Sequence, residues 1–160
     1  MENNLTKMDK LKIILKDNLF FILMIIVCII FIFNFRIIRV SGNSMDTTLA
    51  NKEFHFAKLT NNITYNDIIV ANSEILDCII IKRVIAIPGD TIEIKDNKFY
   101  LNGNLLEENY IKEDMSTPDI NSYTLKEGEY FCCGDNRNHS TDSRAIGPIN
   151  IKDIIGKMMF

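Results

Sequence analysis

The stretch Leu19–Phe33 constrains the fold of this chain more than any other, because all of its residues are apolar. With Asn34 and Phe35 it approaches the roughly 17–25 residues that a membrane-spanning helix requires. A buried helix of a soluble domain would carry a polar stripe, and this stretch has none. A cleavable leader would end in a small-x-small site, whereas the first alanine after the stretch is Ala50. The sequence therefore predicts an uncleaved transmembrane anchor at residues 19–35.

Basic residues on the two sides of this stretch predict its orientation. Those on the N-terminal side are Lys7, Lys10, Lys12 and Lys16, and those just after it are Arg36 and Arg39. The excess on the N-terminal side favours a cytoplasmic N terminus. We therefore expect a single-pass protein with a cytoplasmic segment at 1–18, the anchor at 19–35 and an extracytoplasmic domain at 36–160.

The residues after position 35 show the patterns of β-structure. Alternating or β-branched runs predict strands at 35–40, 54–59, 68–70, 78–87, 91–95, 98–101 and 129–133. Asp96-Asn97 is a good hairpin turn, and the polar segment 107–128 predicts a mostly surface excursion. The run 78–87 is apolar enough that we expect both of its sheet faces to be covered. Helices do not alternate with these strands, so we expect a mainly β domain rather than a parallel α/β fold.

Composition argues against several functions. The net charge of −3 gives no reason to expect a nucleic-acid partner. No Cys/His cluster has the spacing of a metal site, and we expect neither a metal nor another cofactor. Cys78, Cys132 and Cys133 do not make a disulfide framework, so we expect them to be small buried side chains.

Ser44 and Lys82 have the chemistry of a catalytic pair. Ser44 follows Gly42-Asn43, where the glycine allows close backbone approach, although most such serines are ordinary loop residues. Lys82 lies within the apolar run 78–87, where burial would lower its pKa and make its amine a general base. The alternative is that Lys82 forms a salt bridge or reaches water at a sheet edge.

A second dense stretch, 134–144, holds acids, arginines and hydroxyls close together. A solvated loop would explain this composition. The same residues could instead hold Lys82 through a serine hydrogen bond and lock the segment with Asp–Arg pairs. Arg83 lies on the face of its strand opposite Lys82 and needs an acidic partner, for which Asp135 and Asp142 are candidates.

Four sequence blocks resemble the bacterial type I signal peptidases, which are membrane-bound Ser/Lys endopeptidases. In the family's order they are Ser44-Met45-Asp46-Thr47-Thr48-Leu49, Tyr65-Asn66-Asp67-Ile68-Ile69-Val70, Lys82-Arg83-Val84-Ile85-Ala86-Ile87-Pro88-Gly89-Asp90 and Gly134–Arg144. Together they cover nearly the whole chain after the apolar stretch. The small size of the chain resembles the compact Gram-positive type.

The resemblance implies a role for each matching residue. Ser44 is implied to be the nucleophile, Lys82 the general base and Ser140 the serine that orients the lysine. The implied structural ion pairs are Asp142–Arg144 and Asp135–Arg83. The oxyanion hole would use the Ser44 N–H, and the residues implied to lie around it or against the substrate are Gly42, Asn43, Met45, Ile80 and Ile81.

The chain departs from the family pattern at four positions. Thr47 stands where the family has proline, and we expect it to loosen the loop because a fixed φ is lost. Asn66 replaces a glycine, and we expect it to adopt the same left-handed conformation. Ala86 replaces another glycine, and Gly42 stands where some members supply a serine hydroxyl to the oxyanion hole. None of these changes removes a catalytic group.

By this resemblance we expect a coiled antiparallel β-sheet catalytic domain of the signal peptidase and LexA-like type, preceded by one transmembrane α-helix. The expected activity is removal of N-terminal signal peptides from exported preproteins after small-x-small sites, at the plasma membrane. The expected partners are those signal peptides, the lipid bilayer and a nearby secretion translocon. Two alternatives are a catalytically silent assembly factor, for example in pilus biogenesis, and a self-cleaving repressor. The apolar stretch stands where such a repressor would have a DNA-binding domain, which disfavours the second.

Overall fold

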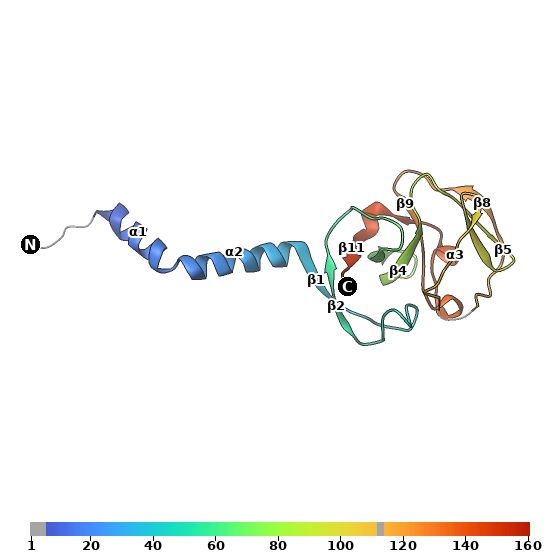
Figure 1. Cartoon of the computed structure of the whole chain (residues 1–160), viewed down its shortest axis with the longest axis horizontal. Coiled ribbons are helices and arrows are strands. Elements are labelled where there is room, and N and C mark those ends of the chain that lie inside the picture. The colour runs from blue at the N-terminus through green and yellow to red at the C-terminus, as the bar shows by residue number, and fades with distance from the viewer. Residues whose placement is uncertain (1–5, 112–113) are drawn as a thin grey trace, which may run out of the picture. The chain divides into compact units, whose positions relative to one another are not determined.

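The structure is a computed structural model of the chain that describes residues 6–111 and 114–160. The chain divides into two compact units, residues 1–35 and residues 36–160. The first unit contains the helices α1 (Lys7–Asp17) and α2 (Leu19–Asn34) (Figure 1). None of the α2 residues is buried, and the side chains of Phe20 and Phe33 are among the most exposed. Across the described part of the chain, no helix is both long enough and apolar enough to cross a membrane.

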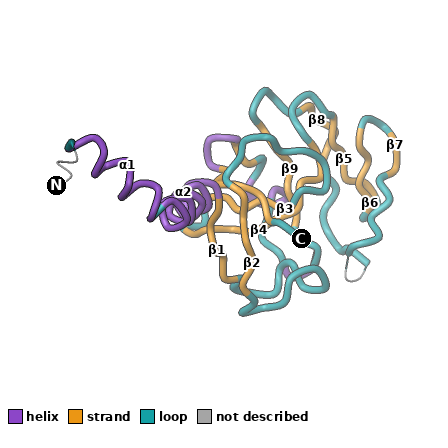
Figure 2. The backbone as a smooth tube through the Cα atoms, turned by 60° about the vertical axis from the view of Figure 1, so that its left-hand side comes forward, coloured by secondary structure: helices purple, strands orange, loops and turns teal. Residues whose placement is uncertain are grey.

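The second unit is built from two antiparallel sheets (Figures 1 and 2). In spatial order, the larger sheet contains β1 (Phe35–Arg39), β2 (Phe54–Lys58), β11 (Ile154–Met158), β3 (Ile68–Ser73), β4 (Cys78–Ala86), β9 (Glu129–Cys133) and β10 (Ile149–Asn150). The smaller sheet contains β7 (Asn104–Leu105), β6 (Lys98–Leu101), β5 (Thr91–Lys95) and β8 (Ile120–Thr124). Short helices η1 (Arg137–His139), α3 (Ser143–Ile146) and η2 (Ile151–Asp153) connect the last strands. The predicted mainly β, antiparallel fold is confirmed.

β4 is the strand around which the second unit is packed. It pairs with β3 from Cys78 to Arg83, and with β9 from Arg83 to Ala86. Side chains from β4 enter two separate core clusters, with Val84 in one and Ile85 in the other. The prediction that both faces of this run are covered is correct for its second half only. At the other end Ile79 is 58% exposed, because there the strand borders an open groove.

The hairpin predicted at Asp96-Asn97 is confirmed. It joins β5 to β6, and both turn residues have positive φ angles of 51° and 60°. Such angles are those of a type I′ turn, whose twist matches that of the flanking strands.

The prediction that 107–128 is a mostly surface excursion is confirmed for most of its described residues, although two of its side chains are buried. This segment contributes β8 to the smaller sheet, and Met115 and Leu125 are buried in the same core cluster as Phe99 and Phe131. Its apolar residues are widely spaced along the sequence, so their common contact produces no recognisable periodicity.

The cysteines follow the prediction in part. Cys132 and Cys133 are buried on opposite faces of β9, one in each of the two clusters that flank this strand. Cys78 was expected to be buried as well, but it is exposed at the start of β4.

Candidate active site

Ser44 lies in the loop after β1, and the segment after β9 holds this loop in place. Asn136 donates its backbone N–H to the Ser44 carbonyl oxygen and its side-chain amide to the Asn43 carbonyl oxygen, each at 3.0 Å. Thr48 Oγ1 donates to Asp135 Oδ2 at 2.5 Å. The backbone around the serine is therefore fixed from one side by two consecutive residues.

Gly134 allows these two segments to approach each other. A Cβ atom at this position would collide with the Ser44 carbonyl oxygen and with the Ser140 side chain. The packing at Gly134 thus requires a residue without a side chain, because backbone oxygen cannot move aside as a flexible side chain can.

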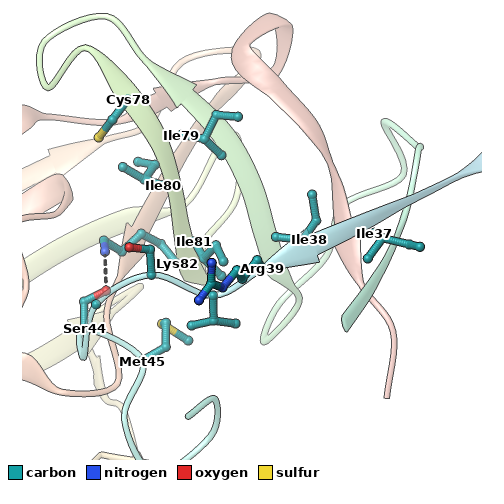
Figure 3. A pocket seen from close by; sticks show the side chains of 13 residues that line it. Ile37, Ile38, Arg39, Ser44, Met45, Cys78, Ile79, Ile80, Ile81 and Lys82 are labelled. Carbon is teal, nitrogen blue, oxygen red and sulfur yellow. Dashed lines mark hydrogen bonds between the residues drawn. The ribbon is translucent and has the colours of Figure 1, made fainter. Parts of the chain in front are cut away.

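Lys82 reaches Ser44 from β4. Its Nζ lies 2.8 Å from Ser44 Oγ, within hydrogen-bond distance (Figure 3). The residue is only 4% exposed. Burial lowers the pKa of the Lys82 amine, and it outweighs the opposing effect of the Asp142 carboxylate, which raises it. The arrangement places an amine that loses its proton more readily than usual beside a serine hydroxyl.

Ser140 does not form the hydrogen bond to Lys82 that the resemblance implies. Its Oγ is buried and completes no hydrogen bond within the described residues. The Lys82 amine instead bonds to Ser44 Oγ, so Ser140 is close to the site but does not hold the lysine in this structure.

Both Asp–Arg pairs named from the sequence are present in the structure. Arg83 binds Asp135 through two contacts, with Nε 2.8 Å from Oδ1 and Nη2 2.6 Å from Oδ2. Arg144 also binds Asp142 in a bidentate manner, with Nε 2.8 Å from Oδ1 and Nη2 2.8 Å from Oδ2. Burial alone would raise the pKa of the Asp142 carboxyl, but the Arg144 guanidinium and the Gly134 N–H lower it below its ordinary value.

A third pair, Arg137–Glu108, was missed by the sequence reasoning. Arg137 is 2% exposed, and its Nη1 donates to Glu108 Oε2 at 2.7 Å. Tyr110 donates its hydroxyl to the same carboxylate at 2.9 Å, and its ring lies 4.1 Å from the Arg83 guanidinium carbon. Glu108 belongs to no motif and is distant in sequence from Arg137, so no local signal joins them.

Thr47 corrects the expectation of a loosened loop. Its φ angle is +88°, which proline cannot adopt because its ring fixes φ near −65°. Thr47 N–H donates to Asp46 Oδ1 at 2.9 Å, and its Oγ1 donates to the Tyr110 carbonyl oxygen at 3.3 Å. The threonine therefore ties the loop to another segment. At Asn66 the predicted left-handed conformation is confirmed, with φ of 64°.

A groove runs along the first half of β4 to Ser44 and Lys82 (Figure 3). Its other wall is formed by β1 and the Ser41–Met45 loop. Of the residues predicted to contact substrate or the oxyanion, Gly42, Met45, Ile80 and Ile81 line this groove. Asn43 does not line it, and its carbonyl oxygen accepts a hydrogen bond from the Asn136 side-chain amide. In the described chain β9 pairs with β4 only from Arg83 onward, so the β4 edge beside the groove carries no strand.

Comparison with known proteins places these features in a family. Residues 12–160 match the family model described as signal peptidase, peptidase S26. A signal peptidase I of Streptococcus pneumoniae serotype 4 is 33% identical, and the match covers 96% of this chain and 95% of that protein. Signal peptidase I P of Bacillus subtilis subsp. natto is 37% identical over 84% of this chain and 80% of that protein. The crystal structure of a signal peptidase I from Enterococcus faecalis V583 is similar with a TM-score of 0.55 and 31% identity, covering 61% of this chain and 97% of that one.

The conformation of Thr47 predicts how this position responds to substitution. We expect Thr47→Pro to lower the free energy of unfolding by more than about 1 kcal/mol, because the native φ is incompatible with proline. Thr47→Gly keeps the φ accessible and should remain within about 1 kcal/mol of the wild type. Guanidinium unfolding of the full chain in detergent micelles measures both. A Thr47→Pro protein as stable as the wild type would contradict the left-handed conformation.

Proposed function

This chain belongs to the signal peptidase family, peptidase S26, and we propose that Ser44 and Lys82 perform its hydrolysis of signal peptides as nucleophile and general base. The observation that carries this proposal is the 2.8 Å contact between Lys82 Nζ and Ser44 Oγ, made by a lysine that is 4% exposed. An exposed lysine would be protonated at neutral pH and could not accept a proton. The buried one has a lowered pKa and can do so.

The reaction begins when Ser44 Oγ attacks the carbonyl carbon of the scissile peptide bond. The neutral Lys82 amine takes the hydroxyl proton as the new C–O bond forms. A tetrahedral intermediate results, with its negative charge on the former carbonyl oxygen. The Ser44 N–H donates to no other group in the described chain and is the donor we assign to this oxygen. Such a donor contributes roughly 2.7–4 kcal/mol of transition-state stabilisation in other hydrolases.

The intermediate collapses when the C–N bond breaks. The Lys82 ammonium returns its proton to the leaving nitrogen, which departs as the amine of the mature protein. The acyl group remains on Ser44 as an ester. The regenerated amine then takes a proton from water as the water attacks this ester, and the returned proton frees the Ser44 hydroxyl.

We propose that the substrate binds in the groove as an extended strand. The β4 edge from Cys78 to Lys82 offers unpaired backbone groups beside the serine, which is what strand addition requires. Met45 and Ile80 are buried and line the groove, and such apolar walls suit small, uncharged side chains at the first and third positions before the cut. This lining supports cleavage after small-x-small sites.

We propose further that the first unit anchors the protein in the plasma membrane, with the N terminus cytoplasmic. The side chains of α2 are apolar and none is buried, and exposed apolar surface of this extent is typical of a segment that contacts lipid. The lysines before α2 favour this orientation. The second unit would then meet signal peptides outside the cytoplasm, near the secretion translocon.

Substitutions at Ser44 and Lys82 test the catalytic assignment. We expect wild type in detergent micelles to cleave a synthetic preprotein after a small-x-small site, which sequencing of the new N terminus identifies. Ser44→Ala and Lys82→Arg should each reduce kcat/KM by about 10⁴–10⁶, as loss of a catalytic group does in other serine peptidases. Lys82→Arg keeps the charge but cannot act as a base. Lys58→Arg, an exposed site on β2, is the matched control and should leave cleavage unchanged. A folded wild type that cleaves nothing would instead favour a silent assembly factor.

The pH dependence of cleavage follows from the lowered pKa of Lys82. Lys82 is active when neutral, so kcat/KM should rise with pH through the folded pKa of the amine. That midpoint should lie below the ordinary lysine value of 10.5. A pH profile of kcat/KM measured from pH 5 to 10 tests this. A profile that falls over this range, or that persists unchanged in Lys82→Ala, would remove Lys82 from the base role.

Charged substitutions within α2 test the membrane anchor. Wild type should float with phospholipid vesicles in a density gradient. A double variant Ile26→Lys and Ile29→Lys should float much less, because each lysine near the centre of a bilayer costs about 2.5–3.5 kcal/mol. Ile75→Lys, on the exposed turn between β3 and β4, serves as control and should float like wild type. Equal flotation of all three proteins would contradict anchoring by α2.

A further inference from the structure

We propose that Arg39 makes the groove select a substrate with an acidic side chain at the second or fourth position before the cut. The inference rests on the proposed function, because it assigns the charge preference of the same groove. Arg39 lines the groove and has no carboxylate partner among the described residues, and alternate side chains of an extended substrate would face it.

Arg39 is exposed at the end of β1 and lines the groove that leads to Ser44 (Figure 3). Its guanidinium has no carboxylate partner among the residues that the structure describes. It lies only loosely over Phe54 on the neighbouring strand, 5.8 Å from the ring centroid. The Glu53 carboxylate on the segment before β2 contacts the Ala50 N–H and His55, both through Oε2, rather than Arg39. The charge of Arg39 is therefore available to a ligand.

The remaining lining of the groove makes this charge distinctive. Among the described residues that line the groove, the other charged side chain is Lys82, which is hydrogen-bonded to Ser44 and must be neutral to act. The other walls are largely isoleucine side chains of β1 and β4. A peptide in the groove would meet Arg39 as its one fixed charge.

The alternation of side chains in a strand indicates which substrate positions are affected. Successive side chains of an extended peptide point to opposite sides. The first and third positions before the cut face the buried part of the groove, near Met45 and Ile80. The second and fourth then face the exposed rim, to which Arg39 belongs. A carboxylate there can pair with the guanidinium, whereas a lysine would be repelled.

Cleavage of matched peptides tests the inference. Synthetic preprotein peptides would carry Asp, Asn or Lys at the second or the fourth position, with the first and third kept as alanine. For wild type we expect kcat/KM to favour Asp over Lys at one of these positions by about fivefold, the upper end of the range for a single exposed charge pair. The preference should disappear in Arg39→Gln and reverse in Arg39→Glu. It should also shrink at high salt.

A control variant distinguishes failure of the Arg39 charge preference from failure of the proposed peptidase function. Arg36→Gln changes an arginine on the same strand that does not line the groove, and it should keep the wild-type preference. Cleavage of all peptides at equal rates would overturn the role of Arg39 and leave the proposed function intact. A preference that survives in Arg39→Gln would overturn it too. If folded wild type cleaved none of the peptides, the proposed function itself would fail.

Discussion

The burial of the Lys82 amine against the Ser44 hydroxyl is the interaction on which the rest of the site depends. Water around the amine would restore its ordinary pKa, so the lowered pKa requires the strand that carries Lys82 to lie inside the sheet. β4 meets this requirement through β3 on one side and β9 on the other. The same strand must also leave its first half uncovered, because a substrate has to reach Ser44. Both conditions are met because β9 pairs with β4 only from Arg83 onward, next to Lys82.

Arginine–carboxylate pairs fix the segments that meet at this point. Arg83–Asp135 joins β4 to the segment after β9, and Arg137–Glu108 joins that segment to the chain that precedes β8. Buried pairs of this kind add little net stability, but removing one partner leaves a buried charge and is strongly destabilising. Their main effect here is therefore on geometry. Asp135 and its neighbour Asn136 hold the backbone around Ser44, so a shift of either residue would move Ser44 relative to Lys82.

The sequence revealed the parts of the site that lie within patterned segments. Lys82 stands out because it interrupts a β-branched strand, and alternation alone places Arg83 on the opposite face. Glu108 could not be found in this way, since its pairing depends on the folding back of a segment without periodicity. The conformation of Thr47 was equally hidden, because it is stabilised by contacts to Asp46 and to the Tyr110 carbonyl oxygen. Residues whose geometry is set by distant backbone leave no local signal.

The uncovered edge of β4 carries a risk that its surroundings reduce. An apolar strand with unpaired backbone groups is a template for pairing with other chains, and proteins protect such edges with charges and neighbouring loops. Here the facing wall formed by β1 and the Ser41–Met45 loop turns the open edge into a groove. Arg39 adds a positive charge at this edge, and an apolar segment that paired there would have no carboxylate to bind it. The facing wall and the Arg39 charge, which would favour peptides with an acidic side chain, would thus also discourage non-specific strand pairing at this edge.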